Sequence, residues 1–120
     1  MRCGLLGQTL AHSHSPLLHS LLGGYAYTLF EKAPDQVEDF LKNGSWDGLN
    51  VTIPYKKTAY ALCDSLSPIA RETGNVNTLL RRRDGSIFGD NTDAFGFRYL
   101  LEKAGVPVAG KRALVLGAGG

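Results

Sequence analysis

Short apolar runs alternate along this chain with stretches of helical periodicity, and glycine or proline stands at most of the junctions. Runs of this length predict strands, and the helical stretches between them are long enough to return the chain to the same end of a sheet. The pattern therefore predicts an α/β fold, a three-layer domain whose mostly parallel sheet is flanked by helices. The predicted strands are 3–6, 26–31, 49–53, 76–82, 86–88 and 113–116; the predicted helices are 15–22, 34–41, 55–63 and 92–103.

Local signals support several of these boundaries. Pro16 stands in the first turn of its helix, where a missing N–H costs nothing, and four leucines supply an apolar stripe behind it. Asp84-Gly85 is a strong hairpin signal between two strands. The segment around Ser67-Pro68 is expected to form a turn. The leucines of the stripe are Leu17, Leu18, Leu21 and Leu22.

Composition excludes several classes of protein. The chain has 120 residues, of which 43% are hydrophobic, and a net charge of +2, so we expect a globular chain and neither a disordered nor a nucleic-acid-binding one. The basic run 81–83 is expected to be a solvated hairpin arm. The apolar run 3–7 is too short for a signal peptide or a membrane span. Cys3 and Cys63 are expected to be reduced thiols, which predicts a cytoplasmic protein.

A first polar cluster, 12–16, lies between a predicted strand and a predicted helix. The hydroxyls of Ser13 and Ser15, beside free backbone N–H groups, suit a carboxylate or a phosphate. From the residues alone, a capping role is favoured for Ser15, and Ser13 is left unexplained. His12, His14 and His19 match no zinc spacing with a fourth ligand nearby, so no metal is expected.

A second polar cluster, 50–56, ends the predicted strand 49–53. Strand alternation places Asn50 and Thr52 on one face, where a ligand is one possible partner. Lys56 falls in the first turn of the next helix, where the macrodipole disfavours a cation. That position suits proton transfer, and a plain surface lysine, as expected for Lys57, is an equally good interpretation.

Two further clusters and the last residues complete the candidate sites. Asn77 follows a polar interruption at a strand start, and 90–93 contains four capping-type residues in a row, more than one helix needs. At the other end, 117–120 begins as G-x-G after an apolar run, which is a weak dinucleotide-binding signal by itself.

Taken together and in order, these segments resemble the N-terminal part of the shikimate dehydrogenases, over essentially the whole chain. The family motifs H-S-x-S-P, N-V-T-x-P-x-K, the end of G-A-V-N-T, N-T-D and the opening of a glycine-rich turn match 12–16, 50–56, 77–78, 91–93 and 117–120. The departures are Thr9 for proline, Ser20 for asparagine, Asn75 for alanine and Ala94 for glycine.

The resemblance implies a substrate-binding domain for shikimate and 3-dehydroshikimate, which such an enzyme interconverts with NADPH in the synthesis of aromatic amino acids. Lys56 and Asp93 would be the catalytic pair, facing each other across the substrate. Ser13 and Ser15 would hold the substrate carboxylate, and the ring hydroxyls would be bound by Asn50, Thr52, Asn77 and Asp93. NADP would be held by Gly117, Ala118, Gly119 and Gly120.

The same resemblance implies a division of the chain into a substrate domain over 1–104 and the start of an NADP-binding domain over 105–120. On that division the strand 113–116 would be the first of a truncated Rossmann-type domain, and these 120 residues alone would not turn over. A homodimer is a further expectation. Two alternatives stay open: a quinate/shikimate dehydrogenase that uses NAD, and a non-catalytic binding module for polyhydroxylated carboxylic acids.

Overall fold

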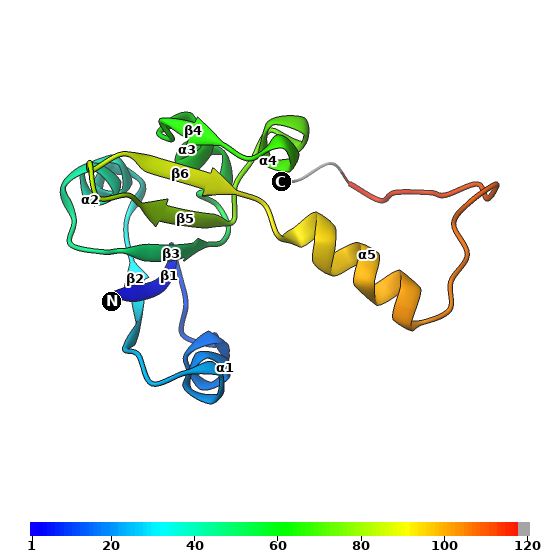
Figure 1. Cartoon of the computed structure of the whole chain (residues 1–120), viewed down its shortest axis with the longest axis horizontal. Helices are drawn as coiled ribbons and strands as arrows, with labels where there is room; N and C mark the ends of the chain where they lie inside the picture. The colour runs from blue at the N-terminus through cyan, green and yellow to red at the C-terminus, as the bar shows by residue number, and fades with distance from the viewer. Residues whose placement is uncertain (118–120) are drawn as a thin grey trace.

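The computed structural model describes residues 1–117, and the strands in this part of the chain form one six-stranded sheet (Figure 1). The spatial order is β2-β1-β3-β5-β6-β4. The pairs β1–β2, β1–β3 and β4–β6 are parallel, and the hairpin side of the sheet, β3–β5 and β5–β6, is antiparallel. The predicted α/β fold with a mostly parallel sheet is confirmed. The strands are β1 (Cys3–Gly7), β2 (Tyr27–Glu31), β3 (Gly48–Val51), β4 (Ser65–Leu66), β5 (Thr78–Arg81) and β6 (Ile87–Asp90).

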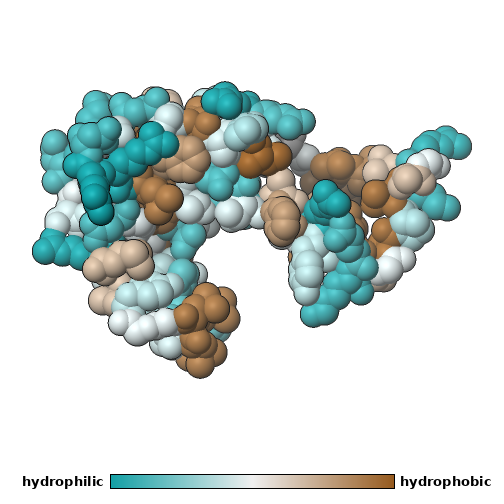
Figure 2. Space-filling model, viewed as in Figure 1, coloured by the Kyte–Doolittle hydropathy of each residue, from teal (hydrophilic) through white to brown (hydrophobic). Residues whose placement is uncertain are grey.

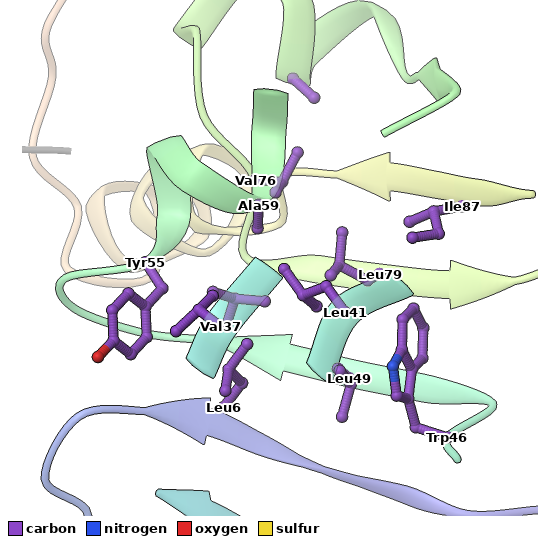
Figure 3. Packing of buried hydrophobic residues seen from close by; sticks show 12 residues of the cluster. Leu6, Val37, Leu41, Trp46, Leu49, Tyr55, Ala59, Val76, Leu79 and Ile87 are labelled. Carbon is purple, nitrogen blue, oxygen red and sulfur yellow. The ribbon is translucent and has the colours of Figure 1, made fainter. Parts of the chain in front are cut away.

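Three short helices, within 37–43, 56–61 and 68–73, cover one face of this sheet and enclose the core (Figure 3). Leu6, Leu49 and Leu79 reach this face from three neighbouring strands, and Val37 and Leu41 meet them from a helix. Because successive strand residues point to opposite faces, only every second strand residue enters this core. The helices are α1 (Ser15–Leu22), α2 (Val37–Asn43) after the 3-10 turn η1 (Pro34–Gln36), α3 (Lys56–Ala61), α4 (Pro68–Thr73) and α5 (Asp93–Lys103).

The opposite face of the sheet carries polar side chains and α1. In the strand register Leu5 lies beside Asn50, Asn50 beside Thr78, and Thr78 beside Asp90. This row shares its face with Tyr27, on which His19 of α1 stacks. The fold therefore separates an apolar core face under α2, α3 and α4 from a mixed face beside α1, on which a row of polar side chains lies.

The apolar stripe of α1 does not face the core as its periodicity suggested. Its four leucines, at 17, 18, 21 and 22, are 57–78% exposed, and no residue of α1 is buried (Figure 2). The helix contacts the edge strand β2, so the sheet offers no surface beneath the stripe. The longest helix, α5, likewise projects from the sheet with no buried residue (Figure 1).

The segment predicted as a turn around Ser67-Pro68 instead contains β4 and the start of α4. Ser67 is the N-cap of α4, and its Oγ accepts a hydrogen bond from the N–H of Ala70 at 3.1 Å. Gly74 ends the helix with φ of +65°, a left-handed conformation that favours glycine. Both residues are ordinary helix-capping signals, so the sequence contains signals from which this helix could have been predicted.

The prediction of a strand over 113–116 is wrong. A strand is held by a ladder of hydrogen bonds to a neighbour, and in the described residues 1–117 no segment pairs with 113–116. Leu114, Val115 and Leu116 are 80–89% exposed. Among the same described residues, no helix has the length and apolar character needed to cross a membrane.

Candidate functional site

The residues proposed as a catalytic pair form an ion pair. Lys56 is the first residue of α3, the next element after β3, and Asp93 is the first residue of α5, the next element after β6. Lys56 Nζ lies 2.5 Å from Asp93 Oδ2, with the two side chains 20% and 54% exposed. The two side chains that the resemblance places on either side of a substrate are thus in direct contact in this structure. The contact places a cation against the N-terminus of a helix, an unfavourable position that the carboxylate offsets.

The second oxygen of the Asp93 carboxylate is held by Asn77. Asn77 Nδ2 donates to Asp93 Oδ1 at 2.8 Å, and Asn77 Oδ1 accepts from the backbone N–H of Thr92 at 2.9 Å. The carboxamide thus binds the residue before α5 and the first residue of α5 together. Lys56, Asn77 and Asp93, from three separate segments, form one connected group with a fixed carboxylate.

A second group lies at the other end of the β3–α3 connection. Ser13, Ser15 and Thr52 line a cavity of about 370 Å³, whose remaining lining is largely apolar and contains no carboxylate. Hydroxyl donors suit an anion such as a carboxylate, and the neighbouring Glu31 carboxylate already accepts from the backbone N–H of Leu10 at 2.6 Å. Thr52 and Lys56 are four residues apart, so this cavity and the ion pair flank the same short segment.

The structure corrects the capping role expected of Ser15. Ser15 is the first residue of α1, the N-cap is His14, and the cap residue makes no side-chain hydrogen bond. Ser13 makes the capping contact instead, because its Oγ accepts a hydrogen bond from the backbone N–H of Ser15 at 3.2 Å. The Ser15 hydroxyl is therefore not consumed by capping.

Asn50 lies in a third group, with a residue that sequence reasoning missed. The hydroxyl of Tyr27 donates to Asn50 Oδ1 at 2.7 Å, and His19 stacks on the Tyr27 ring with centroids 3.7 Å apart. Burial raises the pKa of Tyr27 to about 12, against a smaller lowering by a side-chain hydrogen bond with Ser15. Tyr27 is thus a neutral phenol that donates to Asn50. Its position at the start of a strand, on the face of Asn50, was the available signal.

The proposed cofactor residues are only partly described. Gly117 has φ of +99°, a conformation that glycine adopts freely and that suits a tight turn. Ala118, Gly119 and Gly120 lie outside the described residues. Within 1–117, no three His, Cys, Asp or Glu side chains converge as metal ligands.

Comparison with known proteins gives one consistent family. The model of the shikimate dehydrogenase substrate binding domain matches residues 5–79. A shikimate dehydrogenase (NADP(+)) from Methylococcus capsulatus is 43% identical over 99% of this chain and 46% of its own length. The chain therefore spans about half the length of the curated relatives that it matches.

Solved structures agree with the sequence relatives. A shikimate dehydrogenase from Peptoclostridium difficile superimposes with a TM-score of 0.88 at 37% identity, over 99% of this chain and 47% of that one. A shikimate 5-dehydrogenase from Thermus thermophilus, solved in complex with shikimate, gives a TM-score of 0.86 at 40% identity, over 99% and 48%.

Proposed function

This chain belongs to the shikimate dehydrogenase substrate-binding domain family, and from that premise we propose that it is the substrate-binding part of an NADP-dependent shikimate dehydrogenase. The reaction would be the reversible reduction of 3-dehydroshikimate to shikimate. The observation that carries the proposal is the Lys56–Asp93 ion pair, joined to Asn77 and lying on the same connection as a cavity lined by hydroxyls. One end of the site offers a charged proton donor and the other offers neutral donors for a carboxylate.

Substrate orientation is the first task of these residues. Ser13 and Ser15 would donate to the substrate carboxylate, and Thr52, in the same cavity, would bind the adjacent ring hydroxyl. Asn50, held by Tyr27, and Asn77, held by Thr92, would bind further ring hydroxyls. The solved relative in complex with shikimate supports this substrate class for the chain.

Proton transfer is the second task. Lys56 Nζ would give a proton to the carbonyl oxygen of 3-dehydroshikimate as the carbonyl carbon is reduced, and would take a proton from the hydroxyl in the reverse reaction. Asp93 would keep the ammonium group in place and accept from a ring hydroxyl. Holding both reacting groups in one orientation is itself a large part of such catalysis.

NADPH, when bound, supplies the hydride for this reaction. The relatives named as NADP(+) enzymes support this cofactor, and the positive φ of Gly117 fits a turn against a dinucleotide. The substrate domain would comprise residues 1–104, which contain the whole core cluster from Leu6 to Ile87 and end just after α5, and residues 105–120 would belong to the cofactor domain.

Calorimetric titration of the 120-residue chain with shikimate tests the carboxylate site. A hydrogen bond to a charged group is worth about 1.5–3 kcal/mol, so Ser13→Ala and Ser15→Ala should each weaken binding about 10- to 150-fold. Ser20→Ala is the matched control, because Ser20 lies on the exposed side of the same helix and donates to Leu17 O. Methyl shikimate, which lacks the carboxylate charge, should lose most of this serine dependence.

Serine variants that bind shikimate as tightly as the wild type would overturn the carboxylate assignment. Absence of shikimate binding by the wild-type chain would count against the proposed substrate class itself.

A further inference from the structure

A buried carboxamide lines the same cavity as the ion pair. Asn91, in the junction between β6 and α5, is 5% exposed and is the one buried polar side chain among the described residues. Such a group is costly to bury unless its donors and acceptor are all engaged. In Asn91 they are engaged, and the partners come from two different segments.

The acceptor of this carboxamide holds the start of α5. Asn91 Oδ1 accepts from the backbone N–H of Asp93 at 2.9 Å. The N-cap residue itself, Thr92, makes no side-chain capping bond, so Asn91 supplies the contact that a cap would normally make. The residue fixed by this bond is the one whose carboxylate faces Lys56.

The donors of the same carboxamide hold the loop between α4 and β5. Asn91 Nδ2 donates to Asn75 Oδ1 at 2.7 Å and to Thr73 Oγ1 at 3.2 Å. Asn75 in turn donates to Thr73 O at 3.1 Å. The next residue of this loop, Val76, donates its backbone N–H to Lys56 O at 3.3 Å. The loop is therefore bound to Lys56 on one side and, through Asn91, to Asp93 on the other.

We infer that Asn91 and Asn75 are positioning residues, an amide pair that holds the Asp93 carboxylate against Lys56 by tying the start of α5 to the loop that also contacts α3. Neither side chain contacts Lys56 Nζ or an Asp93 carboxylate oxygen through a hydrogen bond in the described residues, so the pair acts through the backbone. The effect on shikimate binding rests on the proposed function, whereas the effect on the ion pair does not.

Two measurements on the 120-residue chain test this inference. The first is the hydrogen-exchange rate of the Lys56 ammonium group, followed by nitrogen-15 NMR, which reports how well Asp93 holds and shields it. The second is shikimate affinity by calorimetry. Asn75→Ala removes one acceptor of Asn91 at a partly buried loop position, and Asn75→Asp restores that acceptor but cannot donate to Thr73 O. Asn43→Ala is the control, because Asn43 is exposed and its side chain donates to Asp39 within α2.

With Asn75→Ala, we expect ammonium exchange to accelerate severalfold and shikimate binding to weaken about three- to tenfold, the range for one net hydrogen bond. Asn75→Asp should regain part of both quantities, because it restores the acceptor for Asn91 but not the donor to Thr73 O, and Asn43→Ala should change neither. A merely structural role would lower the melting temperature and leave the exchange rate of the folded state unchanged.

The inference is overturned if Asn75→Ala leaves Lys56 exchange at the wild-type rate in the folded chain. Asn91→Ala serves as a second variant with the same expectation, and Asn75→Ala decides alone if Asn91→Ala does not fold. If the wild-type chain binds no shikimate, the proposed function fails, and the exchange rates still decide between a positioning role and none.

Discussion

Replacing Lys56 by alanine separates a role in chemistry from a role in stability. The ion pair that the substitution removes has an Asp93 side chain that is 54% exposed, so water screens the interaction. Exposed pairs of this kind contribute about 0.2–1 kcal/mol to the free energy of unfolding. Lys56→Ala should therefore lower the melting temperature by only about 5 °C or less, measured by circular dichroism on the 120-residue chain.

The same substitution should abolish turnover and leave substrate affinity nearly intact. A positioned general acid typically contributes about 10²- to 10⁴-fold to a rate, so a loss of that size is expected when the proton donor is removed. The assay is NADPH oxidation by 3-dehydroshikimate, in a fusion of residues 1–104 to the remaining half of the Methylococcus capsulatus relative. Lys57→Ala is the matched control, since Lys57 is the next residue of α3 and is exposed.

Normal turnover by Lys56→Ala, in a fusion whose wild-type form is active, would remove Lys56 from the mechanism. An equal loss in Lys57→Ala would show that the positive charge of this helix start matters and the identity of the lysine does not. A parallel loss of shikimate affinity would make Lys56 a binding residue above all.

Three further predictions concern packing and titration. Gly89→Ala should destabilise the chain by about 1–3 kcal/mol in urea unfolding, because a Cβ there would lie 2.6 Å from Cys63 Sγ, whereas Gly96→Ala, with open space, should stabilise α5 by about 0.5–1 kcal/mol. Burial raises the pKa of the Cys63 thiol to about 11 from 9.0, so in a Cys3→Ser variant iodoacetamide at pH 8 should react about a hundredfold more slowly than with an ordinary thiol, and reaction at the ordinary rate would contradict the burial. Burial likewise raises the pKa of Tyr27 to about 12 from 10.0, so the folded state favours the neutral phenol. The resulting contribution to the free energy of unfolding is complete below about pH 10 and is lost as the pH rises towards 12. Unfolding curves of Tyr27→Phe measured over this pH range should not show that loss.

Much of the fold followed from periodicity, and the differences have physical causes. Hydrophobic spacing identified α1 correctly as a helix, but spacing cannot tell what the apolar stripe will contact, and the stripe lies exposed beside an edge strand. The six-residue α4 was missed because only Ala70 is buried, which leaves little apolar periodicity, although its capping residues Ser67 and Gly74 were available as signals. The run 113–116 has strand composition and lacks a neighbour among the described residues.

The sequence proposed a set of residues for the candidate site and gave little of its geometry. A surplus of polar residues at element ends pointed to Ser13, Thr52 and Asp93, and the family resemblance supplied their roles. Contacts between distant segments could not be predicted from local sequence patterns. The hydrogen bond that Asn91 donates to Asn75 depends on how the α4–β5 loop meets the start of α5, and no spacing along the chain encodes that approach.

The most direct test of the proposed substrate site is chemical-shift mapping of the nitrogen-15-labelled 120-residue chain during titration with shikimate. One substrate molecule that spans the site should shift both the hydroxyl-lined group and the ion-pair group together, with a single affinity. The residues expected to shift are Ser13, Ser15, Thr52, Lys56, Asn77 and Asp93. Shifts confined to surfaces away from Lys56 and Asp93, or no shifts at millimolar shikimate, would contradict the account.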